Sequence, residues 1–95
     1  MNRTEHLLTI IAEECAEVAQ RATKAARFGL YEIQPGQELT NIERLKHEYN
    51  DLIAAIEMLE SNEKRSINRE DFLVYKKQCK IADFLKYSNE CGTLD

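Results

Sequence analysis

The sequence predicts an all-α protein, a three-helix protomer whose first two helices form an antiparallel hairpin. Apolar residues recur every three or four positions along most of the chain, and no segment alternates as a strand would. Helix start and stop signals divide the chain into three stretches. Its 95 residues are expected to form a single domain over 1–95, with a core at about 2–60 and a C-terminal helix at about 68–91. A core of this size is modest, so oligomerisation into a four-helix-type bundle would help it.

The first predicted helix has a start signal and a stop signal. Asn2 is a candidate N-cap with Glu5 three residues later, which is the spacing of a capping box. Phe28 is the last periodic apolar residue, and Gly29 suits the position just beyond a helix end. The segment 30–39 contains Gln-Pro-Gly-Gln and is expected to form a loop with a type II turn.

The second and third helices are marked in the same way. Thr40 followed by Glu43 matches a capping box, and the apolar pattern continues to about Glu60. The third helix is expected to start after Asn68 and to stop before Gly92. A polar segment connects these two helices.

Composition excludes several classes of function. The net charge of −4 and the pI near 5.2 lack the basic footprint of a nucleic-acid-binding protein. No apolar run is long enough to span a membrane and no secretory signal opens the chain, so we expect a cytoplasmic protein. The cysteines Cys15, Cys79 and Cys91 form an odd set without metal-site spacing, and the histidines His6 and His47 are isolated.

Two acidic clusters are the most informative residues of the chain. Glu13, Glu14 and Glu17 lie in the first predicted helix, and Glu48 and Asp51 lie in the second. Successive side chains of a helix are turned by 100° about its axis, which places Glu14 inside the apolar stripe of its helix. Glu17 lies at the edge of this stripe, and Glu13 lies further round the helix. Glu48 lies within the stripe of the second helix, with Asp51 beside it. Both pairs therefore face or border the core. In an antiparallel hairpin the two pairs would lie about one helical turn apart along the hairpin axis.

The residues alone leave two interpretations open. Each acid could be solvated or ion-paired, for example Glu17 with Arg21 four residues later. Alternatively, carboxylates gathered near a core need a cation to compensate their charge. An all-oxygen set without His or Cys favours Mg²⁺, with Mn²⁺ as a substitute, and Mg²⁺ commonly meets substrate phosphates. Lys24 and Arg27 follow the acids on the same helix and are candidates for binding phosphate, or simply surface residues.

Together, Glu13-Glu14-Cys15-Ala16-Glu17 and Glu48-Tyr49-Asn50-Asp51 resemble a known signature, E-E-x-x-E … E-x-x-D. It is the signature of the MazG-like all-α nucleoside triphosphate pyrophosphohydrolases, and the resemblance covers about residues 5–60. It implies Mg²⁺-dependent hydrolysis of (deoxy)nucleoside triphosphates between the α- and β-phosphates, which gives monophosphate and pyrophosphate. It also implies a homo-oligomer, a dimer or tetramer, whose bundle a second chain completes.

The resemblance further implies a role for each acid. Glu14, Glu17, Glu48 and Asp51 would be the metal ligands, and Glu13 would join Glu14 in catalysis as an auxiliary ligand or as the base that orients water. A phosphoribosyl-ATP pyrophosphohydrolase-like enzyme is a close variant. The rival from another class is a non-catalytic helical dimerisation or adaptor module.

Overall fold

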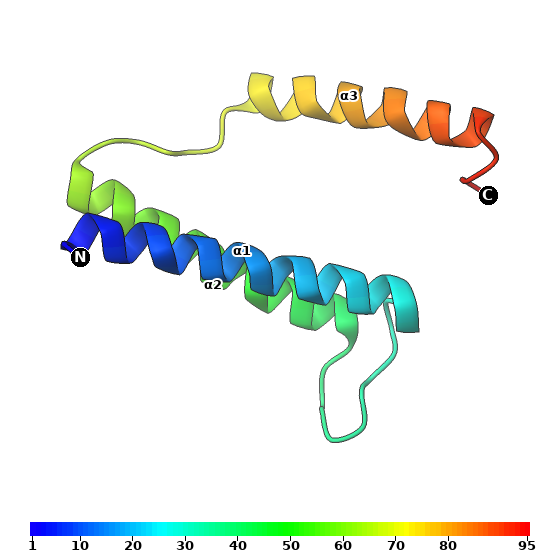
Figure 1. Ribbon diagram of the computed structural model, residues 1–95, viewed down its shortest axis with the longest axis horizontal. Helices are drawn as coiled ribbons and strands as arrows, with labels where there is room; N and C mark the ends of the chain where they lie inside the picture. Colours follow the sequence, from blue (N-terminus) through cyan, green and yellow to red (C-terminus); the bar gives the residue numbers. More distant parts are fainter.

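The structure, a computed structural model, describes residues 1–95 and consists of three helices without strands. These are α1 (Arg3–Phe28), α2 (Asn41–Glu63) and α3 (Asp71–Glu90). Figure 1 shows α1 and α2 side by side as an antiparallel hairpin, whereas α3 lies apart at the end of an extended linker, 64–70. The predicted all-α class and the three helices are confirmed. The order and bounds also agree, except that α2 ends at Glu63 and α3 begins at Asp71, each about three residues later than predicted.

The start and stop signals of α1 act as the sequence predicts. The Asn2 side chain accepts a hydrogen bond from the Glu5 backbone N–H at 2.8 Å, which satisfies one free donor of the first turn. At the other end Gly29 has a φ of 103°, a region that favours glycine, and its N–H donates to the Ala25 carbonyl. Both ends of α1 are therefore determined by local residues.

A complete capping box starts α2. The Thr40 hydroxyl accepts from the Glu43 backbone N–H, and the Thr40 backbone N–H donates to the Glu43 carboxylate at 3.0 Å. The Thr40 hydroxyl also donates to this carboxylate at 2.8 Å. These hydrogen bonds, the backbone one first, lower the pKa of Glu43 below its ordinary value.

We expect Thr40→Ala to destabilise the hairpin by about 1 kcal/mol, because it removes the N-cap acceptor of α2. Part of this effect depends on pH. A lowered carboxylate pKa contributes stability above the unfolded-state pKa, and this contribution is lost as pH falls through the folded-state value. Urea denaturation of wild type and variant at pH 7 and at pH 3 measures both effects. An equal difference at the two pH values would contradict the coupling between Thr40 and Glu43.

The loop between the hairpin helices is fastened by Asn41, which is only 3% exposed. Its side-chain amide donates to the Gly29 carbonyl at 2.8 Å and to the Glu32 carboxylate at 2.9 Å. Its backbone N–H donates to the Glu32 carbonyl. Asn41 thus ties the end of α1 and the loop to the first turn of α2, which fixes how the two helices align.

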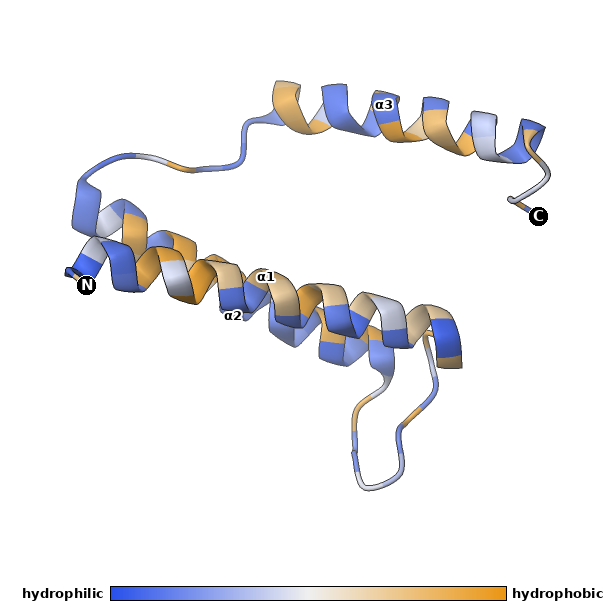
Figure 2. Cartoon of the chain, viewed as in Figure 1, coloured by the Kyte–Doolittle hydropathy of each residue, from blue (hydrophilic) through white to orange (hydrophobic).

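The core of the chain is small and lies between α1 and α2. The buried apolar residues are Leu7 and Ala25 of α1 and Ala55 and Leu59 of α2. Only α1 and α2 pack against each other, and α3 has no buried residue. Figure 2 shows apolar residues along all three helices, including the separate α3. None of the helices is long and apolar enough to cross a membrane.

Candidate metal centre

The hairpin brings three carboxylates from two helices into one cluster. Glu14 of α1 and Glu48 and Asp51 of α2 each place a carboxylate oxygen within 4.8 Å of the other two. Glu14 and Glu48 are half-buried, and Asp51 is exposed. Opposite oxygen ligands of one Mg²⁺ ion lie about 4.2 Å apart, so the spacing of these oxygens is compatible with a single ion.

Helix periodicity explains why these side chains meet. Glu14 follows the buried Leu7 by seven residues, and Glu48 precedes the buried Ala55 by seven. Seven residues are close to two helical turns, so each glutamate continues the row of its helix that faces the other helix. Asp51 lies three residues after Glu48 and borders the same row. The inward-facing positions predicted from the sequence are confirmed for Glu14 and Glu48, which are half-buried, whereas Asp51 borders the row and is exposed.

The cluster carries negative charge that no ion pair compensates. Partial burial raises the pKa of Glu14 above its ordinary value, and the neighbouring acids Asp51, Glu48, Glu17 and Glu13 raise this pKa further, in that order. The only ion pair of the chain joins Arg69 and Asp71, far along the sequence. No cation of the chain therefore pairs with the cluster, and a bound divalent cation would relieve its repulsion.

The raised pKa of Glu14 predicts a specific pH dependence of stability. Because folded Glu14 holds its proton more tightly than unfolded Glu14, this group destabilises the fold increasingly as pH rises above the ordinary value of 4.5. We therefore expect Glu14→Gln, measured without divalent cations, to be more stable than wild type at pH 7 and to converge with it near pH 4. Thermal denaturation across this range in a chelating buffer measures the difference. A difference that is constant with pH would contradict the assignment.

Glu13 and Glu17 lie beside the cluster rather than in it. Both are exposed, and neither belongs to the group of three oxygens, although both contribute to the raised pKa of Glu14. The alternative in which Glu17 pairs with Arg21 is wrong, because no ion pair joins them. The structure thus gathers three of the four predicted ligands and leaves Glu17 nearby.

Arg21 is a residue whose position the sequence reasoning missed. It is only 7% exposed, and its Nη1 is buried without a hydrogen-bond partner. It follows Glu14 by seven residues, so the same projection that turns Glu14 inward could have found it. The sequence instead suggested an ion pair with Glu17, four residues earlier. The interface between α1 and α2 therefore holds a buried guanidinium as well as the acids.

The two predicted phosphate-binding residues lie towards the loop end of α1. Lys24 is half-buried and lines a shallow cleft with Phe28 and residues of the loop, about 15 Å along the helix axis from Glu14. Arg27 is exposed, and its guanidinium lies 5.0 Å from the centre of the Phe28 ring. Neither side chain is part of the carboxylate cluster, so a role in binding requires a ligand that extends along the hairpin.

The arrangement supports a hard cation held by oxygen ligands. The three carboxylates converge from two helices, and the exposed Asp51 leaves one side open to water or to a ligand. Around Asp51, α2 forms a shallow depression lined also by Lys46, His47 and Asn50. Comparisons with protein-family models, with curated proteins and with solved structures found no match for this chain.

Proposed function

We propose that this protein is a Mg²⁺-dependent nucleoside triphosphate pyrophosphohydrolase that cleaves between the α- and β-phosphates. The observation that carries the proposal is the convergence of Glu14, Glu48 and Asp51 from two antiparallel helices. These residues belong to the two halves of the pyrophosphohydrolase signature that the sequence resembles. The raised pKa of Glu14 adds support, because it reflects partial burial together with neighbouring negative charge, and a cation would offset both.

Each acidic residue has a proposed task. Glu14, Glu48 and Asp51 would hold the ion, and Glu17 would complete the ligand set from the edge of the cluster. When bound, Mg²⁺, or Mn²⁺ in its place, neutralises phosphate charge and makes a bound water more acidic. Glu13 would orient the attacking water or accept its proton, since it borders the cluster without belonging to it. Lys24 and Arg27 would bind the more distant parts of the substrate.

The decisive experiment identifies the products formed from a panel of substrates. Nucleoside triphosphates, deoxynucleoside triphosphates and phosphoribosyl-ATP are incubated with the protein and Mg²⁺, and the products are separated by ion-exchange chromatography. Monophosphate plus pyrophosphate is the expected result, and turnover of phosphoribosyl-ATP alone would favour the phosphoribosyl-ATP variant. Diphosphate plus phosphate would contradict the proposed bond cleavage.

One observation favours a second candidate function, that of a helical dimerisation or adaptor module. The helix α3 exposes large apolar residues, among them Phe72 and Tyr75, which are 72% and 65% exposed. An adaptor that only presents such a surface would show no thermal stabilisation by Mg²⁺, whereas the enzyme gains stability by mass action when the ion binds. Thermal denaturation with and without Mg²⁺ separates the two functions.

Self-association is part of the proposal for either function. Only 6 of the 95 residues are buried, and no large side chain is fully buried. A two-helix hairpin of this kind would gain its missing core by packing with a second copy into a four-helix-type bundle, as a dimer or a tetramer.

A further inference from the structure

Three basic residues lie on the hairpin between the carboxylate cluster and the loop. They are Arg21 and Lys24 of α1 and Arg44 of α2. Lys24 lines the cleft at the loop end together with Gln34, and the Gln34 side-chain oxygen accepts a hydrogen bond from Arg44 Nη1 at 2.9 Å. Arg21 lies on α1 between Glu14 and Lys24. We call Arg21, Lys24 and Arg44 the basic set.

The basic set lies on the edge of the hairpin at which the carboxylate cluster is open. Viewed from the start of α1, Lys24 is turned about 80° anticlockwise from Glu14. Viewed from the start of α2, Arg44 and Asp51 are turned about 40° and about 60° anticlockwise from Glu48. In two antiparallel helices that face each other, the same sense of rotation leads to the same edge. Because Asp51 is the exposed member of the cluster, the basic set borders the side on which a ligand can reach the cluster.

Arg21 is the innermost member of the basic set. It is 93% buried, and its Nη1 has no hydrogen-bond partner. It is turned only about 20° from Glu14, towards the same edge as Lys24. Long side chains of a helix lean towards its N-terminus, which from Arg21 is the direction of the carboxylate cluster. A buried guanidinium without a partner lowers stability, so its place beside the cluster points to an anionic ligand that the free chain lacks.

No carboxylate of the chain neutralises the basic set. Glu17 lies four residues before Arg21 but forms no ion pair with it. Glu32 lines the same cleft as Lys24, yet its carboxylate accepts a hydrogen bond from the Asn41 amide at 2.9 Å and forms no ion pair either. The basic set therefore keeps its positive charge available for a ligand.

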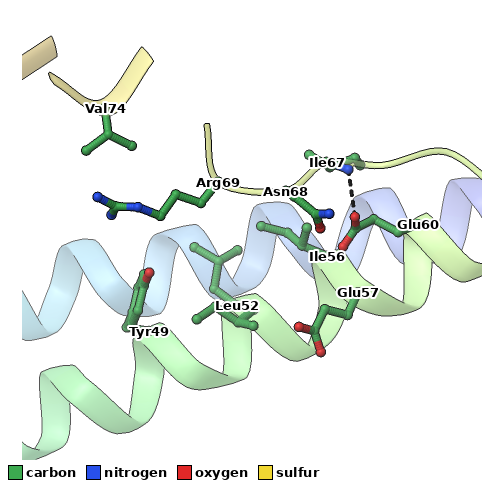
Figure 3. Close-up of a pocket in the computed structure, with 10 residues that line it drawn as sticks. Tyr49, Leu52, Ile56, Glu57, Glu60, Ile67, Asn68, Arg69 and Val74 are labelled. Carbon is green, nitrogen blue, oxygen red and sulfur yellow. Dashed lines mark hydrogen bonds between the residues drawn. The ribbon is translucent and has the colours of Figure 1, made fainter. Parts of the chain in front are cut away.

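The pocket in Figure 3 offers a different chemistry. It lies between α2, the linker and the start of α3, and its lining is mainly apolar with two acids, Glu57 and Glu60. Its one basic residue, Arg69, is paired with Asp71 at 3.0 Å, and the Arg69 side chain is 69% exposed. An anion in that pocket would meet two carboxylates and a guanidinium that already has a partner. The basic set on the hairpin is better suited to bind an anion.

The length of the basic set indicates the shape of the ligand. Along the axis of α1, Arg21 and Lys24 lie about 10 Å and about 15 Å from Glu14. A guanidinium can donate two parallel hydrogen bonds to one phosphate, and a lysine adds a further positive charge. A single small anion could contact only one end of this row. A chain of phosphates can contact the metal centre and the basic set at once.

We propose that the basic set binds the β- and γ-phosphates of the nucleoside triphosphate, which leave together as pyrophosphate. These two phosphates carry most of the negative charge of the substrate, whereas the nucleoside carries none, so the phosphates complement the basic set. The inference rests on the proposed hydrolysis. It adds Arg21 and Arg44 to Lys24 as residues that bind the substrate.

The test measures the binding of inorganic pyrophosphate, which represents the two outer phosphates. Isothermal titration calorimetry in a buffer with Mg²⁺ compares wild type with Arg21→Met and Arg44→Met. The control is Arg65→Met, which removes the same charge from an exposed position beyond the far end of α2. Wild type and control are expected to bind pyrophosphate equally. The two hairpin variants are expected to bind it at least about 10-fold more weakly, because each loses hydrogen bonds to a charged group.

The stability of each variant shows whether a loss of binding is specific. Arg21→Met removes an unpaired buried charge, so this variant is expected to stay folded, and thermal denaturation without pyrophosphate checks it. Equal affinity for pyrophosphate in wild type and Arg21→Met overturns the proposal, as does a wild type that binds no pyrophosphate. Nucleotide hydrolysis is measured on the same samples. Pyrophosphate binding that depends on Arg21, without turnover of any nucleotide, contradicts the proposed hydrolysis but supports the basic set as a site for phosphate chains.

Discussion

Replacing Glu48 with glutamine is expected to lower Mg²⁺-dependent nucleotide hydrolysis by at least about 100-fold. A metal ion contributes several kcal/mol of charge stabilisation in the transition state, and each 1.36 kcal/mol is a tenfold change in rate. Glutamine keeps the shape of the side chain but removes one of three charges that lie within 4.8 Å of one another. The measurement is pyrophosphate release at saturating Mg²⁺, with the initial rate compared between wild type and variant.

The same substitution has a second expected effect that a merely structural role would not give. Without Mg²⁺, Glu48→Gln is expected to be at least as stable as wild type, because it removes repulsion with Glu14. Addition of Mg²⁺ is expected to stabilise wild type and not the variant.

The control is Glu57→Gln, an exposed acid that projects to the opposite side of α2 from Glu48. It should keep both the activity and the thermal shift. Equal losses in the two variants, or a Mg²⁺ shift that survives Glu48→Gln, would contradict the metal site.

The parts of the fold that the sequence predicts are those determined by local residues. Asn2 and Thr40 cap their helices as expected, because an N-cap needs only a side-chain oxygen and a free N–H two or three residues later. Glu14 and Glu48 meet for a similar reason. The apolar rows of α1 and α2 fix which sides face each other, and each glutamate is a member of its row.

The end of α2 is decided by contacts that no periodicity reveals. The helix runs past Glu60 to Glu63 and ends at Lys64, which adopts a left-handed conformation with a φ of 54°. The Glu60 carbonyl accepts from the Arg65 N–H, and the Glu60 carboxylate accepts from the Ile67 N–H at 2.7 Å. Without a glycine or proline, the sequence offered no stop signal there.

The position of α3 relative to the hairpin could not be predicted from the sequence either. Helix periodicity predicts the helix itself, but apolar residues on two opposite sides do not tell which side packs on what. In the structure neither side is covered, and α3 packs against neither α1 nor α2. Which surface covers each side depends on contacts between distant parts of the fold or between chains, and such contacts leave no signal in local patterns.

The second large effect is expected from Arg21→Met, which should stabilise the chain without Mg²⁺ by about 1–3 kcal/mol. A buried polar atom without a hydrogen bond costs about 1–3 kcal/mol, and apolar replacement of buried charge is often stabilising. The Nη1 of Arg21 is such an atom, and the residue is only 7% exposed. Methionine keeps an unbranched stem that fills the same space between α1 and α2. Thermal denaturation should show a rise of roughly 4–8 °C for each kcal/mol.

Arg27→Met is the matched control, because Arg27 lies on the same helix but is exposed, with its guanidinium beside the ring of Phe28. Its effect should stay within about 0.5 kcal/mol, as for most surface substitutions. If Arg21→Met instead destabilises the chain, the guanidinium has a partner that α1 and α2 do not supply. A destabilisation that appears only at concentrations where the protein is dimeric would place that partner in the second copy. A destabilisation that is independent of concentration would contradict the account of Arg21 as an unpaired buried charge.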